Sequence, residues 1–574
     1  MSDISQVRVK KAAKKDKAPA ANAAPVALRN CSSVAVAYAL LYCVSAVLAK
    51  LWMFRGGAGG IDSNRYAFDL GVILLAPFVT RHLLKLAEPS VLKRNSRLLM
   101  LVCVGMFDNL FSGLTSLVLA SDFAGSAFGM ADGLAESSAP FLLPHLFAPM
   151  LATLLMSPGA GRAVAVCVAL THVAFVPEDM ILPSMLMVLI PACVKLDSVA
   201  KVRRRFQQLG VFALGALLQL IGILAHIMLK FADNTKPAEL GLDLLASTAL
   251  VLLSAALSFT AVILLLPVME HLFGACSNIK LNNYADLEHP LLRALSNDAP
   301  GTYQHSTKVA DLAFAAAGKI GANQLLCRVG AYFHDIGKID NPKYFAENIG
   351  YGEQNPHDKI PPSMSASILE AHIKQGLAYA DSHKFPPEIR GIIKEHHGTT
   401  IKEYFLFKAR EQAKLKALEN GGAGGPAEKV DESAFRYGSD KPRTKESAII
   451  MLADSVEAAT RSLANVTPQS IASFVEDITK KKINDGQFDE CPLSFTEINA
   501  IKKSFIISLQ HILHHRIAYP KDAAKTANAN ARDKDDDDDA TQTFATRDAT
   551  QTFATRDSAA NASDPSKPPA KPAR

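Results

Sequence analysis

Histidines and carboxylates recur through the C-terminal half of this sequence in an order that suits metal chemistry. Imidazole nitrogens and carboxylate oxygens are the ligands that divalent first-row metals favour, and one carboxylate between two ions can bridge them. Two ions about 3.5 to 4 Å apart suit attack on a phosphate ester, because they neutralise the charge that grows on the phosphate. A lone histidine on a helix is usually a core or surface residue, so the ordered set, rather than any single histidine, indicates a metal site. The candidate side chains are His305, His334, Asp335, His372, His396, His397 and Asp454.

The segment that carries these side chains predicts an all-helical domain. Apolar residues recur there at i, i+3 and i+4, which is the spacing of one helix face. A Gly-rich stretch over 420–426 predicts an exposed loop. The helical pattern covers 291–295, 309–320, 325–334, 363–378, 387–397, 445–463, 467–485 and 494–515.

The N-terminal half predicts a polytopic membrane domain. The chain is 49% hydrophobic and 20% charged, below the roughly 25% charged residues of soluble proteins, so a wholly soluble protein is excluded. A bilayer core needs about 20 apolar helical residues, so the fourth and fifth of eight apolar runs are marginal. The predicted spans are 33–54, 66–86, 98–120, 140–156, 163–176, 180–196, 210–229 and 242–268.

Lysine and arginine gather in alternate connections, which predicts eight spans with both termini in the cytoplasm. They are dense in the first 32 residues and after the second and sixth spans. The N-terminal arm is too long and too charged for a cleavable signal. We expect it to be disordered near anionic lipid, with a nucleic-acid arm as the alternative. The net charge of +6 is too small to indicate a nucleic-acid polymer as partner.

Asp108 is a carboxylate in the middle of a predicted span. An intramembrane carboxylate costs on the order of 3 kcal/mol, so Asp108 is a functional candidate, with interhelical glue as the alternative. Two functions are alternatives to an enzyme. One is a transporter with a regulatory nucleotide-binding domain, and the other is a signalling scaffold.

The order of the metal-binding candidates resembles the HD superfamily of metal-dependent phosphohydrolases. The surrounding sequence is similar, more specifically, to the seven-transmembrane HD receptors that hydrolyse cyclic di-AMP. The similarity includes the His-Asp-Ile-Gly-Lys run that begins at His334. The matching phrases cover 288–293, 299–306, 328–338, 342–348, 355–359, 395–399 and 451–459.

The resemblance implies two ions, one on each side of Asp335. His305, His334, Asp335 and Asp454 would hold one ion, and Asp335, His372 and His396 the other. The nitrogen-rich set favours iron or manganese over magnesium, which prefers oxygen ligands. The implied reaction opens cyclic di-AMP to linear pApA and needs no nucleophilic side chain.

The resemblance also implies which residues contact the substrate. His397 would lie behind the ligands or touch the phosphate, and Lys338 would meet the same phosphate unless it is a solvated lysine. Tyr303 is a substrate candidate, with core packing as the alternative. His357 and His383 fall outside the ligand positions and are expected to be structural.

The implied organisation is a membrane domain over 33–268, a linker helix over 269–300 and a cytoplasmic HD domain over 301–520, in a bacterial-type inner membrane. The family usually has a large extracellular sensory domain after the first span, whereas only about ten residues, 55–64, stand there in this chain. The Gly-Tyr-Pro element of cyclic di-GMP hydrolases does not follow His397.

The C-terminal tail over 521–574 is low in apolar residues and is expected to be disordered. It holds one nine-residue sequence twice, over 540–548 and 549–557. A tandem duplication without a role is one explanation. Alternatively, phosphorylated threonines there bind a phosphothreonine-reading partner, the candidates being Thr541, Thr543, Thr550 and Thr552.

Overall fold

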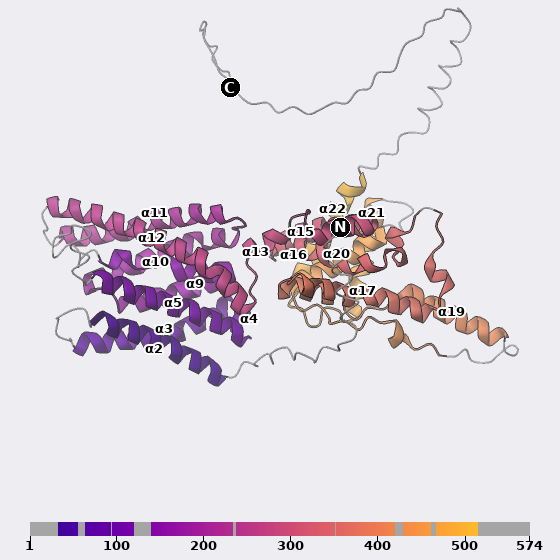
Figure 1. Cartoon of the computed structure of the whole chain (residues 1–574), viewed down its shortest axis with the longest axis horizontal. Coiled ribbons are helices and arrows are strands. Elements are labelled where there is room, and N and C mark those ends of the chain that lie inside the picture. Colours follow the sequence, from indigo (N-terminus) through magenta and orange to yellow (C-terminus); the bar gives the residue numbers. More distant parts are fainter. Residues whose placement is uncertain are drawn as a thin grey trace, which may run out of the picture. The chain divides into compact units, whose positions relative to one another are not determined.

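The structure is a computed structural model that describes residues 32–54, 63–92, 94–119, 139–232, 237–350, 352–419, 429–460 and 467–514. The predicted tail with its repeat, the glycine-rich loop and all but the last residue of the predicted basic arm lie outside these ranges. The described residues form helices and no β-strand, with one isolated bridge between Ile401 and Arg436. The all-helical prediction is therefore confirmed (Figure 1).

The N-terminal part contains six helices that are long and apolar enough to cross a membrane, among the residues described. Two shorter apolar helices, α8 and α9, occupy the positions of the fourth and fifth predicted spans. The long helices are α2 (Ser32–Phe54), α3 (Ser63–Ala87), α5 (Asn95–Leu119), α10 (Ile181–Ala200), α11 (Arg205–Ala232) and α12 (Pro237–Phe273); the short elements are α4 (Pro89–Leu92), η1 (Ala139–Leu142), α8 (Phe147–Leu155), α9 (Pro158–Val173) and η2 (Glu178–Met180).

The fourth and fifth predicted spans, marginal by length in the sequence, are short helices in the structure. The hydroxyl of Ser157 caps the first turn of α9, and Pro158 occupies its first position, so the chain breaks there. Nine residues of α8 rise only about 14 Å at 1.5 Å per residue, which is half of a bilayer core. All nine are buried, so α8 is shielded by neighbouring helices rather than by lipid.

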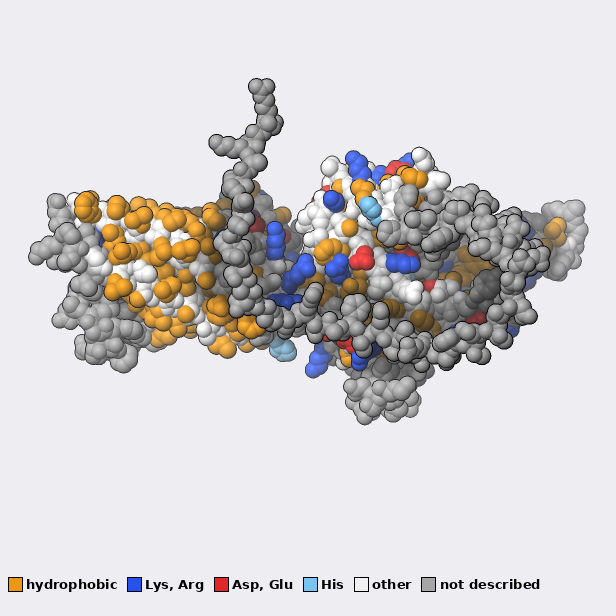
Figure 2. Space-filling model, turned by 90° about the horizontal axis from the view of Figure 1, so that it is seen from above, with side chains coloured by type: hydrophobic (Ala, Val, Ile, Leu, Met, Phe, Trp, Pro, Cys, Tyr) orange, Lys and Arg blue, Asp and Glu red, His pale blue; other side chains and the backbone are white. Residues whose placement is uncertain are grey.

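Large apolar side chains cover the outer surface of the long N-terminal helices. Figure 2 shows hydrophobic side chains over these helices, whereas Lys, Arg, Asp and Glu are visible on the C-terminal domain. Leu245 and Leu264, both on α12, are more than half exposed. Such contiguous apolar exposure is what a helix surface facing lipid requires. The chain is therefore a multi-pass membrane protein.

The polar side chains inside the membrane domain pair with one another. His172 on α9 lies 3.1 Å from Asp108 on α5 and 3.2 Å from the hydroxyl of Ser112. His145 lies 3.3 Å from the hydroxyl of Ser184 on α10. Asp108 on α5 therefore contacts α9. This contact agrees with the alternative that Asp108 holds two helices together.

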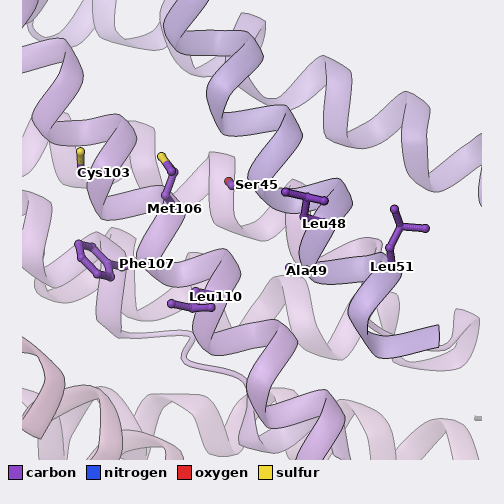
Figure 3. Close-up of a pocket in the computed structure, with 8 residues that line it drawn as sticks. All are labelled: Ser45, Leu48, Ala49, Leu51, Cys103, Met106, Phe107 and Leu110. Carbon is purple, nitrogen blue, oxygen red and sulfur yellow. The ribbon is translucent and has the colours of Figure 1, made fainter. Parts of the chain in front are cut away.

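A groove of about 930 Å³ runs between α2 and α5 in this domain (Figure 3). Its described lining residues include no acidic, basic or histidine side chain, so they do not supply the ligands that the sequence predicts. The lining residues are Ser45, Leu48, Ala49, Leu51, Cys103, Met106, Phe107 and Leu110.

The C-terminal domain packs its helices around one large apolar core and two smaller clusters, and the fully buried members of the large core include Val309, Phe333, Ile393, Ile450 and Phe505. Its longer helices are α13 (Asn278–Tyr284), α14 (Pro290–Asp298), α15 (Pro300–Ile320), α16 (Gln324–Phe333), α17 (Pro362–Ser382), α18 (Pro387–Glu395), α19 (Glu403–Glu419), α20 (Lys445–Thr460), α21 (Pro468–Asn484) and α22 (Phe495–His514). Short 3-10 turns connect them: η3 (Ile336–Asp340), η4 (Pro342–Tyr344), η5 (Ala346–Asn348), η6 (Pro356–Lys359) and η7 (Glu432–Phe435).

Two sequence expectations differ from this domain. The predicted linker helix over 269–300 is instead the end of α12 followed by α13 and α14, and Leu281, Leu291 and Leu292 belong to the domain core. Helix α19 was not predicted, because its charged residues are spread around the helix and leave no clear apolar stripe.

Candidate metal centre

Asp335 lies at the centre of the side chains that the sequence singled out. It follows α16 directly and precedes η3, so its carboxylate is held between two elements of the core. Its side chain is 1% exposed. Metal-ligating atoms from five helical segments surround it in two groups.

The first group contains His305 of α15, His334 at the end of α16 and Asp454 of α20, with ligand atoms that lie within 4.8 Å of one another. The Nε2 atom of His305 lies 2.9 Å from Oδ1 of Asp454, and Nε2 of His334 lies 3.2 Å from Oδ2 of Asp335. All three side chains are buried. The structure therefore brings together the donors that were expected to hold one ion.

The second group contains Asp335, His372 of α17, and His396 and His397, which follow α18. The Nε2 atoms of His372 and His396 lie 3.4 and 3.7 Å from Oδ1 of Asp335 and 3.2 Å from each other. Each oxygen of Asp335 thus faces a different group, as a bridging ligand must. His397 was expected behind the ligands, but its ligating atom lies within the same 4.8 Å as those of the other three.

The outer ring nitrogens of the histidines are fixed by hydrogen bonds. Nδ1 of His334 donates to the carbonyl of Ala331 over 2.7 Å, Nδ1 of His396 donates to that of Ile393 over 2.9 Å, and Nδ1 of His372 donates to that of Leu369. A proton on Nδ1 leaves the lone pair on Nε2, which is the nitrogen that points at the carboxylates. This outer layer is the arrangement that metal-binding histidines show.

Buried polar atoms without partners lie where an ion would bind. Nε2 of His334 and Oδ1 of Asp335 have no hydrogen-bond partner, although both are inaccessible to solvent. An unsatisfied buried polar atom costs about 1 to 3 kcal/mol, and one such atom lies in each ligand group, so each group calls for a ligand. The donor set, histidine with carboxylate, fits a divalent transition metal.

The electrostatics of the two groups differ. Burial lowers the pKa of His372 to about 4 and that of His396 to about 3, so both imidazoles are neutral and able to ligate. Burial also opposes protonation of His334, but the carboxylates of Asp335 and Asp454 outweigh it and raise the pKa of His334 to about 10. Without a bound ion, the carboxylates of the first group therefore favour a positive charge on His334.

Lys338 is buried in this site and is not a solvated helix-end lysine. Its Nζ lies 2.7 Å from Oδ2 of Asp335 and 2.8 Å from Oε1 of Glu347, and its side chain is 9% exposed. The two carboxylates keep the ammonium charged, because they outweigh burial and raise its pKa. Lys338 thus places a fixed positive charge beside the ligands.

A cavity of about 570 Å³ opens from the ligand cluster. Its lining includes five residues of the cluster, His305, Lys338, His372, His397 and Asp454. Aromatic side chains also line it, and they are Tyr344, Phe345, His357, Tyr404, Phe405 and Tyr437. Charged groups and aromatic rings complement the phosphates and bases of a nucleotide.

The remaining sequence candidates take different places. Tyr303 is not among the residues that line the cavity; it packs against the apolar cluster of Leu295 and Ile339, as the core-packing alternative required. His383 bonds the carbonyl of Tyr379 and is structural. His357, expected to be structural, lines the cavity.

Sequence reasoning missed three residues around the cluster. Tyr437 stacks on His397 with ring centroids 4.4 Å apart, and Glu347 bonds Lys338. Glu457 contacts Nδ1 of His305. Only Glu457 left a signal in the sequence, because it follows Asp454 by three residues and must share its helix face.

The comparisons with known families divide the chain as the structure does. Residues 64–277, from α3 to past the end of α12, match the family described as "7TM receptor with intracellular HD hydrolase". Residues 302–459, which contain every ligand described above, match the HD domain. Both parts of the chain are therefore similar to the seven-transmembrane HD family.

Two proteins of similar sequence are named for an enzymatic activity. The cyclic-di-AMP phosphodiesterase PgpH of Bacillus subtilis (strain 168) is 39% identical over 323 residues, which are 56% of this chain and 42% of the relative. The protein of the same name from Listeria monocytogenes serotype 1/2a (strain 10403S) is 35% identical over 376 residues, 66% of this chain and 50% of the relative. The chain thus spans half or less of the length of these curated relatives.

A solved structure of the family is also similar in sequence. The PgpH HD domain of L. monocytogenes, crystallised in complex with cyclic-di-AMP, is 43% identical. The similarity covers 40% of this chain and 99% of that chain, with a TM-score of 0.36.

Proposed function

We propose that this protein is a membrane-bound phosphodiesterase that hydrolyses cyclic di-AMP to linear pApA. The observation that carries the proposal is the carboxylate of Asp335, which faces one group of metal-ligating atoms with each oxygen. Two relatives named as cyclic-di-AMP phosphodiesterases, 35 to 39% identical to this chain over the aligned residues, support the substrate.

The proposed site holds two divalent ions, iron or manganese. His305, His334 and Asp454 hold one, and His372, His396 and His397 hold the other, with Asp335 between them. Two bound ions neutralise charge on the phosphate and lower the pKa of water at the site. His397 is proposed here as a ligand because its ligating atom lies with the others.

The chain's own residues would bind and orient the dinucleotide. The ammonium of Lys338 lines the cavity beside Asp335, where it would attract a phosphate. Aromatic rings in the same lining offer faces on which a base can stack. Phosphate binding and base stacking together would hold one phosphodiester beside the ligand cluster.

The proposed location is a bacterial-type inner membrane with both termini in the cytoplasm. The lysines and arginines of the alternate connections support this orientation, because such residues are enriched in cytoplasmic loops. The helical domain that follows α12 then faces cytoplasmic cyclic di-AMP.

A direct assay tests the proposal. Full-length protein in detergent is stripped of metal, reloaded with manganese and incubated separately with cyclic di-AMP, cyclic di-GMP and linear pApA. We expect cyclic di-AMP to be converted to pApA, cyclic di-GMP to be a poor substrate, and the stripped protein to be inactive. Equal turnover of both cyclic dinucleotides would refute the proposed selectivity, and full activity of the stripped protein would refute the metal requirement.

The tail gives a separate proposal about partners. Phosphorylation of the candidate threonines of the tail would create two copies of one docking sequence. Thr541 and Thr550 occupy one position of the repeat, and Thr543 and Thr552 occupy another. Phosphoproteomics of the intact protein that finds these threonines unmodified would remove this proposal.

A further inference from the structure

One buried carboxylate beside the ligand cluster belongs to neither ligand group. Glu457 lies on α20 three residues after Asp454, so the two carboxylates share one face of that helix. Oε2 of Glu457 contacts Nδ1 of His305, while Oδ1 of Asp454 lies 2.9 Å from Nε2 of the same ring. Carboxylates of one helix therefore contact both nitrogens of the His305 imidazole.

This arrangement separates His305 from His334, His372 and His396. The outer nitrogens of His334, His372 and His396 all donate to backbone carbonyls. A carboxylate is a stronger acceptor than a carbonyl, because the hydrogen bond is assisted by its charge. A carboxylate on the outer nitrogen also makes the inner nitrogen a more basic metal ligand.

The simplest alternative role for Glu457 is an ion pair with Lys308, one turn along α15 from His305. The Nζ of Lys308 lies 3.8 Å from Oε1 of Glu457, beyond hydrogen-bond distance, and the lysine side chain is 49% exposed. An exposed pair of this kind contributes about 0 to 1 kcal/mol. It does not explain a glutamate that is only 3% exposed, since burying a carboxylate is costly.

We propose that Glu457 is a positioning residue that makes the two metal positions unequal. By accepting the Nδ1 proton of His305, it turns Nε2 toward the ion and strengthens that ligand. The ion at His305, His334 and Asp454 is then held more tightly than the ion at His372, His396 and His397. The inference rests on the proposed two-ion site, and it implies that scarcity of metal empties the second position first.

A manganese titration tests the inference. Full-length protein in detergent is stripped with a chelator and titrated with Mn²⁺, and free Mn²⁺ is measured by electron paramagnetic resonance. We expect wild type to show a tight and a weaker class of site. Glu457→Gln removes the charge and keeps the shape, so it should weaken the tight class by about 10- to 100-fold and leave the weaker class unchanged.

Two further variants separate positioning from general stability. Glu457→Leu removes the acceptor as well and should weaken the tight class at least as much as Glu457→Gln. Lys308→Ala removes the alternative partner and should bind both ions as wild type does. Circular dichroism establishes that each variant is folded, and Glu457→Gln alone decides the test if Glu457→Leu does not fold.

Several outcomes would overturn the inference. Unchanged Mn²⁺ binding by Glu457→Gln would remove the role, and equal weakening of both classes would remove the selectivity for one position. A Lys308→Ala protein that matched Glu457→Gln would identify the ion pair as the important contact. Wild type that binds Mn²⁺ in two classes and leaves cyclic di-AMP intact would refute the proposed substrate but not the role of Glu457.

Discussion

At the scale of single residues, Asp335 is the group on which both proposed ions depend. Its two oxygens lie 3.2 to 3.7 Å from the Nε2 atoms of His334, His372 and His396. We expect Asp335→Ala to lose both ions and to lower turnover by on the order of a thousandfold or more. Metal analysis of the purified protein, together with the cyclic di-AMP assay, measures both effects.

His383 provides the control for this prediction. It lies in the same domain and bonds the carbonyl of Tyr379, outside the ligand groups. His383→Ala should keep both ions and nearly full turnover. If the two variants behaved alike, the assignment of ligands would be wrong.

Gly337, in the His-Asp-Ile-Gly-Lys run, is required by a close approach of backbones. A Cβ atom at this position would lie 1.8 Å from the carbonyl oxygen of His372 and 2.6 Å from the nitrogen of Gly376. Gly337→Ala must therefore push η3 away from α17, which separates Asp335 from His372. We expect a loss of about 1 to 3 kcal/mol in the free energy of unfolding, together with lost metal.

Gly391→Ala is the matched change for comparison. Gly391 lies in α18, and a Cβ there would meet only Oε1 of Glu395, at an ordinary 3.8 Å. This variant should be as stable as wild type or slightly more stable, because alanine favours a helix. Denaturant unfolding and metal content distinguish the two glycines, and equal effects would contradict the packing argument.

At the scale of elements, α19 contributes to the cavity although its sequence pattern did not reveal it. Tyr404 stands near its first turn, lines the cavity and is 57% exposed. A base stacked on an aromatic ring gains about 1 to 3 kcal/mol. We expect Tyr404→Ala to raise KM for cyclic di-AMP by roughly 5- to 100-fold with little change in kcat, measured by steady-state kinetics.

Phe407 gives a control on the same helix. It is 64% exposed and does not line the cavity. Phe407→Ala should leave KM unchanged, whereas Tyr404→Phe should retain most of the affinity because the ring face remains. A fall in kcat without a rise in KM for Tyr404→Ala would show that the ring does not bind substrate.

At the scale of the whole molecule, buried polar side chains join helices of the membrane domain. Asp108 joins α5 to α9 through His172, and one of its oxygens has no partner. Asp108→Leu leaves His172 without this partner and should lower the free energy of unfolding by about 1 to 3 kcal/mol. Thermal unfolding in detergent measures the loss.

Asp108→Asn keeps a polar group of the same shape and serves as the comparison. It should be closer to wild type in stability and should hydrolyse cyclic di-AMP at the wild-type rate. Loss of solute uptake in Asp108→Asn with hydrolysis intact would favour a transporter instead.

The sequence by itself determined the ligand types, the helical class and the division of the chain near residue 270. These follow from local properties: residue chemistry, the helical spacing of apolar positions and the length of apolar runs. The two short helices, α8 and α9, were already marginal by length.

Only the tertiary structure decided the contacts between distant elements. It buried Lys338 between two carboxylates, placed His397 among the ligand atoms and set Glu457 against His305, 152 residues away along the chain. Spacing within one helix fixes which residues share a face, but not which face of another helix they meet. That choice depends on how the helices pack around the common core, which no single segment of the sequence contains.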